Sequence, residues 1–414
     1  MGWGVVWWFT ERPPPSVPPL KGEGGASPAH RRWGPRLTTL PPIIADWFAA
    51  KGWVPRQHQL DVLASWQAGD SALLIAPTGA GKTLAGFLPT LVDLADGKQE
   101  GLHTLYISPL KALAVDVQRN LTAPILEMGL KINAETRTGD TPASKRARQR
   151  SRPPNILLTT PEQLCLLISH PHADLFFGSL RRIVLDELHA LVTSKRGELL
   201  ALALARIARL TPNLQITALS ATVARPDLLR DWIAQPLPGR ETQILTASGG
   251  AAPVLEILET KERLPWAGHS ANYAHRDLYE TIRKHRTTLL FVNTRSQAEM
   301  LFQGLWAVND DLLPIALHHG SLSVEQRRKV ESAMVAGTLR AVVCTSTLDL
   351  GIDWGDVDLV VQVGAPKGSS RMLQRIGRAN HRLDEPSKAL LVPSNRFEVL
   401  ECEAALEAVA ERQQ

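Results

Sequence analysis

The segment 71–95, SALLIAPTGAGKTLAGFLPTLVDLA, constrains the fold more than any other part of the chain. It passes from a short apolar run through a glycine-rich turn into a helical pattern, which predicts a strand, a loop and a helix in succession. The loop APTGAGKT fits the phosphate-binding pattern with alanine in the first position. In such a loop, backbone N–H groups at a helix N-terminus cradle phosphates, a lysine reaches the outer ones, and a threonine hydroxyl meets Mg²⁺.

A nucleoside triphosphate site is therefore predicted at this turn, and the alternative is a glycine-rich turn with no ligand. In the first reading Lys82 reaches the phosphates and Thr83 contacts Mg²⁺. The predicted phosphate-binding residues are Pro77, Thr78, Gly79, Ala80, Gly81, Lys82 and Thr83.

Short apolar runs alternate with helical stretches such as RGELLALALARIARL along the rest of the chain. The first set of runs is HTLYISP, NILLTTP, RRIVLDE and LQITALSAT, and the second is TTLLFVN, LPIALHH, RAVVCTS, DLVVQVG and KALLVPS. Buried runs between helices predict an α/β fold with parallel sheets and helices on both faces. Because a Pro/Gly-rich passage, AQPLPGRETQILTASGGAAP, separates the sets, we expect domains at 41–245 and 262–414 joined by a linker at 246–261.

Proline and glycine are dense in the first forty residues, which argues against a helix or a sheet ladder there. We expect residues 1–40 to be a disordered extension, either a tethering arm or a dispensable segment from a wrongly chosen start codon. The remainder is typical of a folded protein, with 44% hydrophobic and 21% charged residues. A chain of 414 residues is also too long for a lone small binding module.

The net charge and the cysteine spacing restrict the possible functions less than the motifs do. Lysine plus arginine exceed aspartate plus glutamate by 46 − 41 = 5, a mild surplus that is compatible with a polyanionic partner. The cysteines Cys165, Cys344 and Cys402 are far apart and show no CxxC spacing, so neither a disulfide framework nor a zinc site is indicated. No apolar run reaches the length of a membrane span. We expect a cytoplasmic protein with no membrane partner.

Two further motifs carry chemistry that a triphosphate site needs. Asp186 and Glu187 follow an apolar strand, where Asp186 would hold Mg²⁺ through its water shell and Glu187 would accept a proton from the attacking water. An acidic pair after a strand can also be an ordinary solvated turn. Arg375 and Arg378, three residues apart, would share one face if that segment is helical, and could reach the γ-phosphate from the second domain. Hydrolysis would then depend on closure of the two domains.

A longer set of motifs occurs in a fixed order: VPRQHQ, APTGAGKT, SPLKALA, TTPEQL, DELH, SAT, LLFVNTRS, HHGSLS, CTSTLDLGID and QRIGRAN. This set resembles superfamily 2 helicases from about residue 43 to residue 414. DELH in place of DEAD, together with SPLKALA and LQRIGRANH, is similar to the Lhr-like group and within it to bacterial ligase-associated DExH-box helicases. The resemblance implies two tandem RecA-like P-loop domains, each a mostly parallel sheet with helices on both faces, that use ATP and Mg²⁺.

The resemblance also implies roles for individual residues. Gln59 matches the adenine-reading glutamine, although Arg56, Gln57 and His58 depart from the family's PTPxQ and leave base selectivity open. The element that links hydrolysis to strand movement falls on Ser220 and Thr222. Further matches are Gly351 and Asp353 near the nucleotide, His189 as a bridge to the second domain, and Arg375 and Arg378 as arginine fingers.

Family contacts to the nucleic-acid backbone fall on loops that follow strands, which suits sequence-independent phosphate binding. They match Ser108, Pro109, Lys111, Gly139, Asp140, Thr160, Pro161, Asn293, Thr294, Arg295, His319 and Thr345. A basic run, Lys145, Arg146, Arg148, Arg150 and Arg152, could add nonspecific attraction or be a solvated helix face.

The function expected from these residues is an ATP-dependent DNA helicase or 3′-to-5′ single-strand DNA translocase, with DNA repair and a ligase partner implied by the family alone. Its partner would be single-stranded DNA or an RNA:DNA hybrid. The alternatives are an RNA helicase, or a nucleotide-gated nucleic-acid clamp with poor turnover. Lhr-like proteins continue into a winged helix and further modules that we do not find here, so unwinding by these two domains stays open, as does the oligomeric state.

Overall fold

A computed structural model describes residues 40–77, 79–97, 100–221, 223, 225–247, 253–268, 270–348, 357–379 and 386–411. The expected extension 1–40 lies outside this description except for Leu40. Four predicted site residues also lie outside the described residues: Thr78, Thr222, Gly351 and Asp353.

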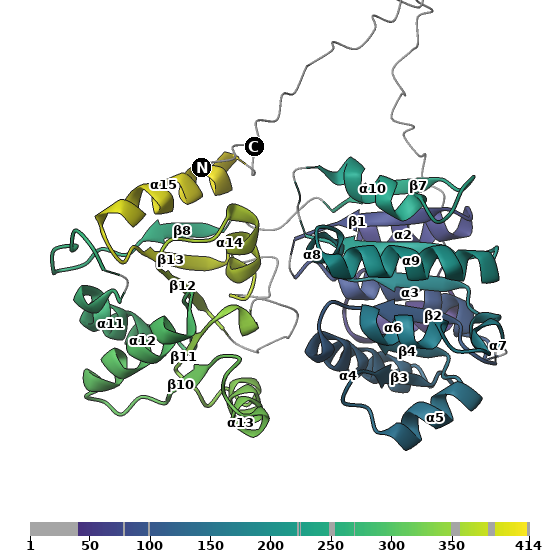
Figure 1. Cartoon of the computed structure of the whole chain (residues 1–414), viewed down its shortest axis with the longest axis horizontal. Coiled ribbons are helices and arrows are strands. Elements are labelled where there is room, and N and C mark those ends of the chain that lie inside the picture. The colour runs from purple at the N-terminus through teal and green to yellow at the C-terminus, as the bar shows by residue number, and fades with distance from the viewer. Residues whose placement is uncertain are drawn as a thin grey trace, which may run out of the picture. The chain divides into compact units, whose positions relative to one another are not determined.

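Seven parallel strands of the described chain form the first sheet, in the order β3-β4-β2-β5-β6-β1-β7 (Figure 1). The strands β1 and β2 are buried along their whole length, as expected for apolar strands covered on both faces. The bounds are β1 Ser71–Ile75, β2 Thr104–Ile107, β3 Ala134–Arg137, β4 Ile156–Thr159, β5 Arg182–Leu185, β6 Gln215–Ser220 and β7 Thr242–Thr246.

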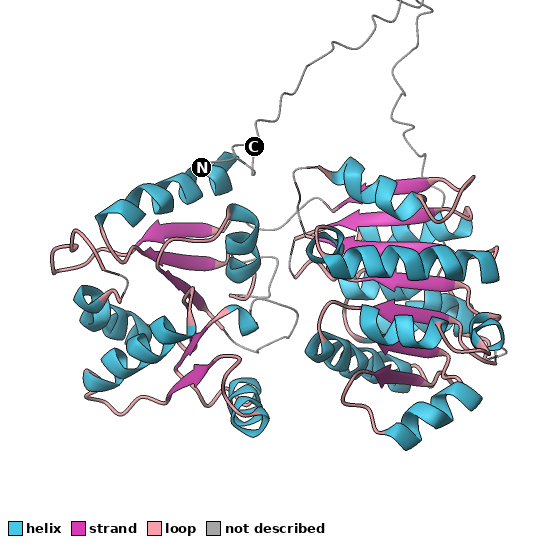
Figure 2. Cartoon of the chain, in the orientation of Figure 1, coloured by secondary structure: helices cyan, strands magenta, loops and turns pink. Residues whose placement is uncertain are grey.

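Helices pack on both faces of this sheet (Figure 2). One apolar core includes residues of α1 Pro42–Ala50, α2 Gln57–Gln67, α3 Lys82–Leu94 and α4 Lys111–Glu127. The other includes residues of α6 Pro161–Ile168, α7 Ala173–Phe177, α8 Leu188–Val192, α9 Lys195–Leu210 and α10 Pro226–Ala234. The remaining helix, α5 Ala143–Ser151, contacts the edge strand β3 through polar side chains.

A second sheet has six described strands, again all parallel, in the order β10-β11-β9-β12-β13-β8. The strand bounds are β8 Val254–Ile257, β9 Thr288–Phe291, β10 Ile315–His318, β11 Ala341–Cys344, β12 Leu359–Val363 and β13 Lys388–Val392. The helices are η1 Asn272–Ala274, α11 His275–Lys284, α12 Arg295–Ala307, α13 Val324–Val335, η2 Ser346–Leu348, α14 Ser369–Ile376 and α15 Arg396–Glu411. Among the described helices, none has the length and apolar character needed to cross a membrane.

The fold expected from sequence, two parallel α/β domains, is confirmed, but three edge strands were not predicted. β3 is polar in sequence, and β7 lies inside the Pro/Gly-rich passage that was expected only to interrupt the pattern. β8 lies inside the expected linker 246–261 and pairs with β13, so the second sheet takes in part of that segment. Edge strands bury less side-chain surface, and their sequences therefore lack the continuous apolar run of a central strand.

Candidate nucleotide site and nucleic-acid interface

The phosphate loop joins β1 to α3, as the sequence predicts. Gly79 and Gly81 have φ values of 79° and 75°, a left-handed conformation that glycine adopts without a steric penalty. Gly81 is the N-cap of α3, so free backbone N–H groups and the positive end of the helix dipole lie at the loop. The ammonium group of Lys82 donates to the Ala76 carbonyl at 2.8 Å. Burial lowers the pKa of Lys82, while the nearby carboxylates Glu187 and Asp186 oppose that shift.

The beginning of α2 holds this loop from outside. Arg56 Nη1 donates to the Gly79 carbonyl at 3.1 Å, and His58 Nε2 lies 2.9 Å from the Ala80 carbonyl, to which it must donate because a carbonyl only accepts. Burial lowers the pKa of His58, which favours the neutral ring. Gln59 is buried, accepts from the Arg56 backbone at 2.9 Å, and would lie 3.0 Å from a Cβ placed on Gly81.

These contacts explain one departure from the family's PTPxQ pattern and give a role to the residue at its variable position. Arg56 stands where the pattern has threonine, His58 stands at its variable position, and each hydrogen-bonds a carbonyl of the phosphate loop. Sequence reasoning treated both as irregular surroundings of Gln59 and did not predict them as loop contacts. The available signal was their place in the segment VPRQHQ, where His58 directly precedes the predicted glutamine and Arg56 lies three residues before it.

Asp186 and Glu187 follow β5 at the same sheet edge as the phosphate loop. Asp186 is buried, with Oδ1 accepting from the Glu187 backbone at 2.9 Å and Oδ2 accepting from the Tyr106 hydroxyl. Burial, with repulsion from Glu187, raises the pKa of Asp186 to about 6, against the effects of the Tyr106 hydrogen bond and the Lys82 charge. Two carboxyl groups therefore lie in the electrostatic surroundings of Lys82.

Glu187 has a strained backbone, with φ 48° and ψ 45°, a conformation that is uncommon for a residue with a side chain. Its Oε2 atom is buried, has no hydrogen bond to the residues that the structure describes, and lies 3.5 Å from His189 Nε2. A buried carboxylate oxygen that no protein donor satisfies is suited to a water or ligand partner. This is the position that a general base for an attacking water requires.

His189 connects three parts of the structure. Its Nδ1 lies 3.2 Å from Ser220 Oγ and accepts from the Ala221 backbone at 3.4 Å, so the DELH and SAT segments are in direct contact. Its Nε2 hydrogen-bonds Gln374 of α14. Burial lowers the pKa of His189, opposed by the Glu187 charge.

The two predicted arginine fingers have different surroundings. Arg375 is buried in the last turn of α14, where it donates to Gln362 and its guanidinium lies 4.8 Å from the Phe291 ring centroid. Arg378 is also buried, but α14 ends at Ile376, so the two do not share a face of one helix as the sequence suggested. The charge of Arg378 contributes to the lowered pKa of Lys82, which brings it into the electrostatic surroundings of the phosphate loop.

The residues fit the ATP and Mg²⁺ that the family implies. The described residues contain no cluster of three or more His, Cys, Asp or Glu side chains suited to a metal. Mg²⁺ in phosphate sites is usually held by one or two protein oxygens together with phosphates and waters, so Asp186 and Thr83 are a sufficient set. The unsatisfied Glu187 oxygen and the glycine-lined loop are the observations that favour a bound group.

In the first domain, the predicted nucleic-acid contacts gather on loops after the neighbouring strands β2, β3 and β4. The ammonium group of Lys111 lies 3.0 Å from Asp140 Oδ1, and a Cβ placed on Gly139 would lie 3.1 Å from the same nitrogen. Lys111, Gly139 and Asp140 are exposed. Four other predicted contacts are buried, so their side chains are not an open surface: Ser108, Pro109, Thr160 and Pro161.

In the second domain, the predicted contacts follow β9, β10 and β11, which are also neighbours. Thr294 and Arg295 are exposed at the start of α12, where Arg295 donates to the Ser321 hydroxyl. Asn293 donates to the Ala365 carbonyl at 2.8 Å. His319 and Thr345 are buried, and His319 Nε2 lies 3.3 Å from Glu299 Oε1.

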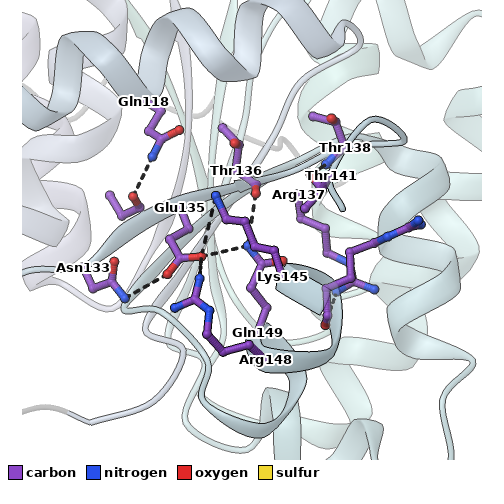
Figure 3. Close-up of polar contacts among 12 residues, drawn as sticks. Gln118, Asn133, Glu135, Thr136, Arg137, Thr138, Thr141, Lys145, Arg148 and Gln149 are labelled. Carbon is purple, nitrogen blue, oxygen red and sulfur yellow. Dashed lines mark hydrogen bonds and ion pairs between the residues drawn. The ribbon is translucent and has the colours of Figure 1, made fainter. Parts of the chain in front are cut away.

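The basic run 145–152 forms most of α5, whose inner side is bound to Glu135 of β3 (Figure 3). Glu135 is buried and accepts from Arg148 at 2.6 Å, Gln149 at 2.9 Å and Asn133 at 3.2 Å. Burial opposes ionisation, but these hydrogen bonds prevail and hold the pKa of Glu135 below its usual value. Arg150 on the outer side of α5 and Arg152 at its C-cap are exposed, which matches the expectation of a solvated basic face.

Comparison with known proteins agrees with this arrangement. Residues 56–229 match the DEAD/DEAH box helicase family, and residues 273–382 match the helicase conserved C-terminal domain. The chain belongs to the superfamily 2 DExH-box helicases. Within that class, its similarity is to the Lhr group.

Two relatives and one solved structure illustrate the similarity. The chain is 36% identical to the Lhr helicase/probable uracil glycosylase of Mycolicibacterium smegmatis over 87% of its length. It is 34% identical to the ATP-dependent helicase Lhr-Core of Methanothermobacter thermautotrophicus over 90%. The structure of Mycobacterium smegmatis helicase Lhr bound to single-stranded DNA and AMP-PNP matches 90% of the chain with a TM-score of 0.80 and 34% identity. The chain spans 27%, 46% and 50% of these three proteins, respectively.

Proposed function

We propose that this chain is an ATP-driven motor that moves along single-stranded DNA and acts as part of a DNA helicase. The observation that carries the proposal is the meeting of Lys82, Asp186 and Glu187, whose charges act on one another at the carboxyl edge of the first sheet. A phosphate loop with a buried acidic pair beside it is the arrangement that phosphoryl transfer to water requires.

The protein groups divide the work as follows. Backbone N–H groups from Gly79 to Lys82 hold the phosphates, and Asp186 and Thr83 are the groups that would hold Mg²⁺, which offsets phosphate charge when bound. Glu187 accepts the proton of the attacking water through its unsatisfied oxygen. Arg378 supplies positive charge from the second domain. His189 and Ser220, which are in contact, link ATP hydrolysis to movement of the bound strand.

Single-stranded DNA is favoured as the substrate by the Mycobacterium smegmatis Lhr structure, which was solved with that ligand. The exposed residues Lys111 and Arg295, each the first residue of a helix, would bind its phosphates without reading sequence. Movement from 3′ to 5′, a role in DNA repair, a ligase partner and a cytoplasmic location belong to the same proposal through the family resemblance.

The experiment is steady-state ATP hydrolysis by the full chain with single-stranded DNA, with single-stranded RNA and with neither, each at low and moderate salt. We expect strong stimulation by DNA that weakens as salt rises, because phosphate contacts release counterions. Lys82→Ala is the matched control and should remove nucleotide binding and hydrolysis together.

Each other result identifies an alternative. Equal or greater stimulation by RNA would replace the DNA assignment with an RNA helicase. ATP binding without stimulated hydrolysis would indicate a nucleotide-gated clamp. Hydrolysis by Lys82→Ala at the rate of the parent would refute the site itself.

A further inference from the structure

Tyr106 lies between the predicted metal carboxylate and the phosphate-loop helix, yet no motif marks it. It belongs to β2, is fully buried, and stacks on Phe87 of α3 with ring centroids 5.4 Å apart and an interplanar angle of 23°. Its hydroxyl donates a hydrogen bond to Asp186 Oδ2. Its ring is therefore fixed by packing while its only polar atom is directed at Asp186.

The hydroxyl fixes the orientation of the carboxylate. Asp186 Oδ1 is held by the Glu187 backbone N–H at 2.9 Å, and Tyr106 holds the second oxygen from another strand. Two donors on different oxygens define the carboxylate plane, and groups that orient metal-binding carboxylates in this way commonly change metal affinity 10- to 100-fold when removed.

Tyr106 also adjoins the loop that carries predicted nucleic-acid contacts. Ser108 follows it by two residues, and the intervening Ile107 carbonyl accepts from the Asp186 backbone N–H at 2.9 Å. Ser108 Oγ in turn accepts from the Leu110 backbone at 3.3 Å, directly before the exposed Lys111. A continuous set of contacts thus runs from this loop to Asp186.

We infer that Tyr106 is a positioning residue that holds Asp186 for Mg²⁺ and connects this carboxylate to the strand-binding loop 108–111. The inference rests on the proposed function, because it assigns Mg²⁺ to Asp186 and nucleic acid to the loop. It adds a residue to the site that neither the helicase motifs nor the family resemblance supplied.

The test uses Tyr106→Phe, which keeps the stacked ring and removes only the hydroxyl. Affinity for ADP is measured as Mg²⁺ is titrated, and again with the metal chelated. Without metal, the variant should bind ADP as tightly as the parent does. The Mg²⁺ midpoint, the concentration that gives half of the metal's effect on ADP affinity, should rise by about tenfold or more. Adding single-stranded oligothymidylate should shift that midpoint in the parent and much less in the variant.

The matched control is Tyr279→Phe, which removes a hydroxyl that donates to Asp311 at 2.9 Å in the second domain. It should leave the Mg²⁺ midpoint unchanged. A parent-like midpoint in a folded Tyr106→Phe variant would overturn the positioning role, and an undiminished response to oligothymidylate would overturn the connection to the loop. Failure of the proposed function is distinguishable, because the parent itself would then bind ADP without any response to Mg²⁺.

Discussion

At the scale of single residues, the backbone conformation and burial of Glu187 support its proposed role as the general base. Its backbone is left-handed, and its buried Oε2 atom has no hydrogen bond within the described part of the chain. Glu187→Gln should therefore keep ATP binding and lower turnover by about 10²- to 10⁴-fold, because an amide cannot accept the proton from water. Nucleotide affinity and single-turnover hydrolysis, measured on the same preparation, separate the two effects.

The control for this prediction is Glu162→Gln, which removes an exposed carboxylate paired with Arg196 in the same domain. It should hydrolyse ATP at the rate of the parent. If Glu187→Gln also kept the parent's turnover, Glu187 would not be the base.

At the scale of elements, sequence alone predicted the buried strands well and the edge strands poorly. Central strands such as β1 are continuous apolar runs, and this pattern is visible without any structure. β3 instead pairs on one side only and alternates between buried and partly buried residues, so AETR carries little signal. The same limit applies to the site: motif spacing indicated Lys82 and Asp186, whereas Tyr106 and His58 act through contacts between elements that spacing does not encode.

The contact between β3 and α5 gives an element-scale prediction. Glu135→Gln should lower the free energy of unfolding by about 2 kcal/mol near neutral pH, because charge-assisted hydrogen bonds in a buried site are lost. The folded protein holds the pKa of Glu135 below the ordinary 4.5, so the stabilisation is present above that value and disappears as pH falls through the folded pKa. Denaturant unfolding of parent and variant, measured from neutral to acidic pH, should show that the difference between their free energies of unfolding becomes smaller as pH falls.

The control for this element is Glu325→Gln, whose carboxylate is 81% exposed and pairs with Lys329 on one helix. Exposed pairs of this kind contribute little, so its stability should stay close to that of the parent at every pH. A Glu135→Gln variant as stable as the parent at neutral pH would show that α5 does not depend on this contact.

At the scale of the whole molecule, hydrolysis should require both domains, because the first supplies the phosphate loop and the acidic pair while the second supplies Arg378. The charge of Arg378 already acts on Lys82, whereas Arg375 is committed to Gln362 in its own domain. Arg378→Ala should therefore lower turnover by about 10³-fold or more and change ATP affinity little, since an arginine finger acts mainly on the transition state. Arg371→Ala, at an exposed position of α14, should keep the turnover of the parent. The measurement is kcat and nucleotide affinity for both variants. A loss of kcat confined to Arg378→Ala would make the second domain a direct participant in hydrolysis. An equal loss of kcat in the two variants would show that Arg378 is only one contributor to a general positive field.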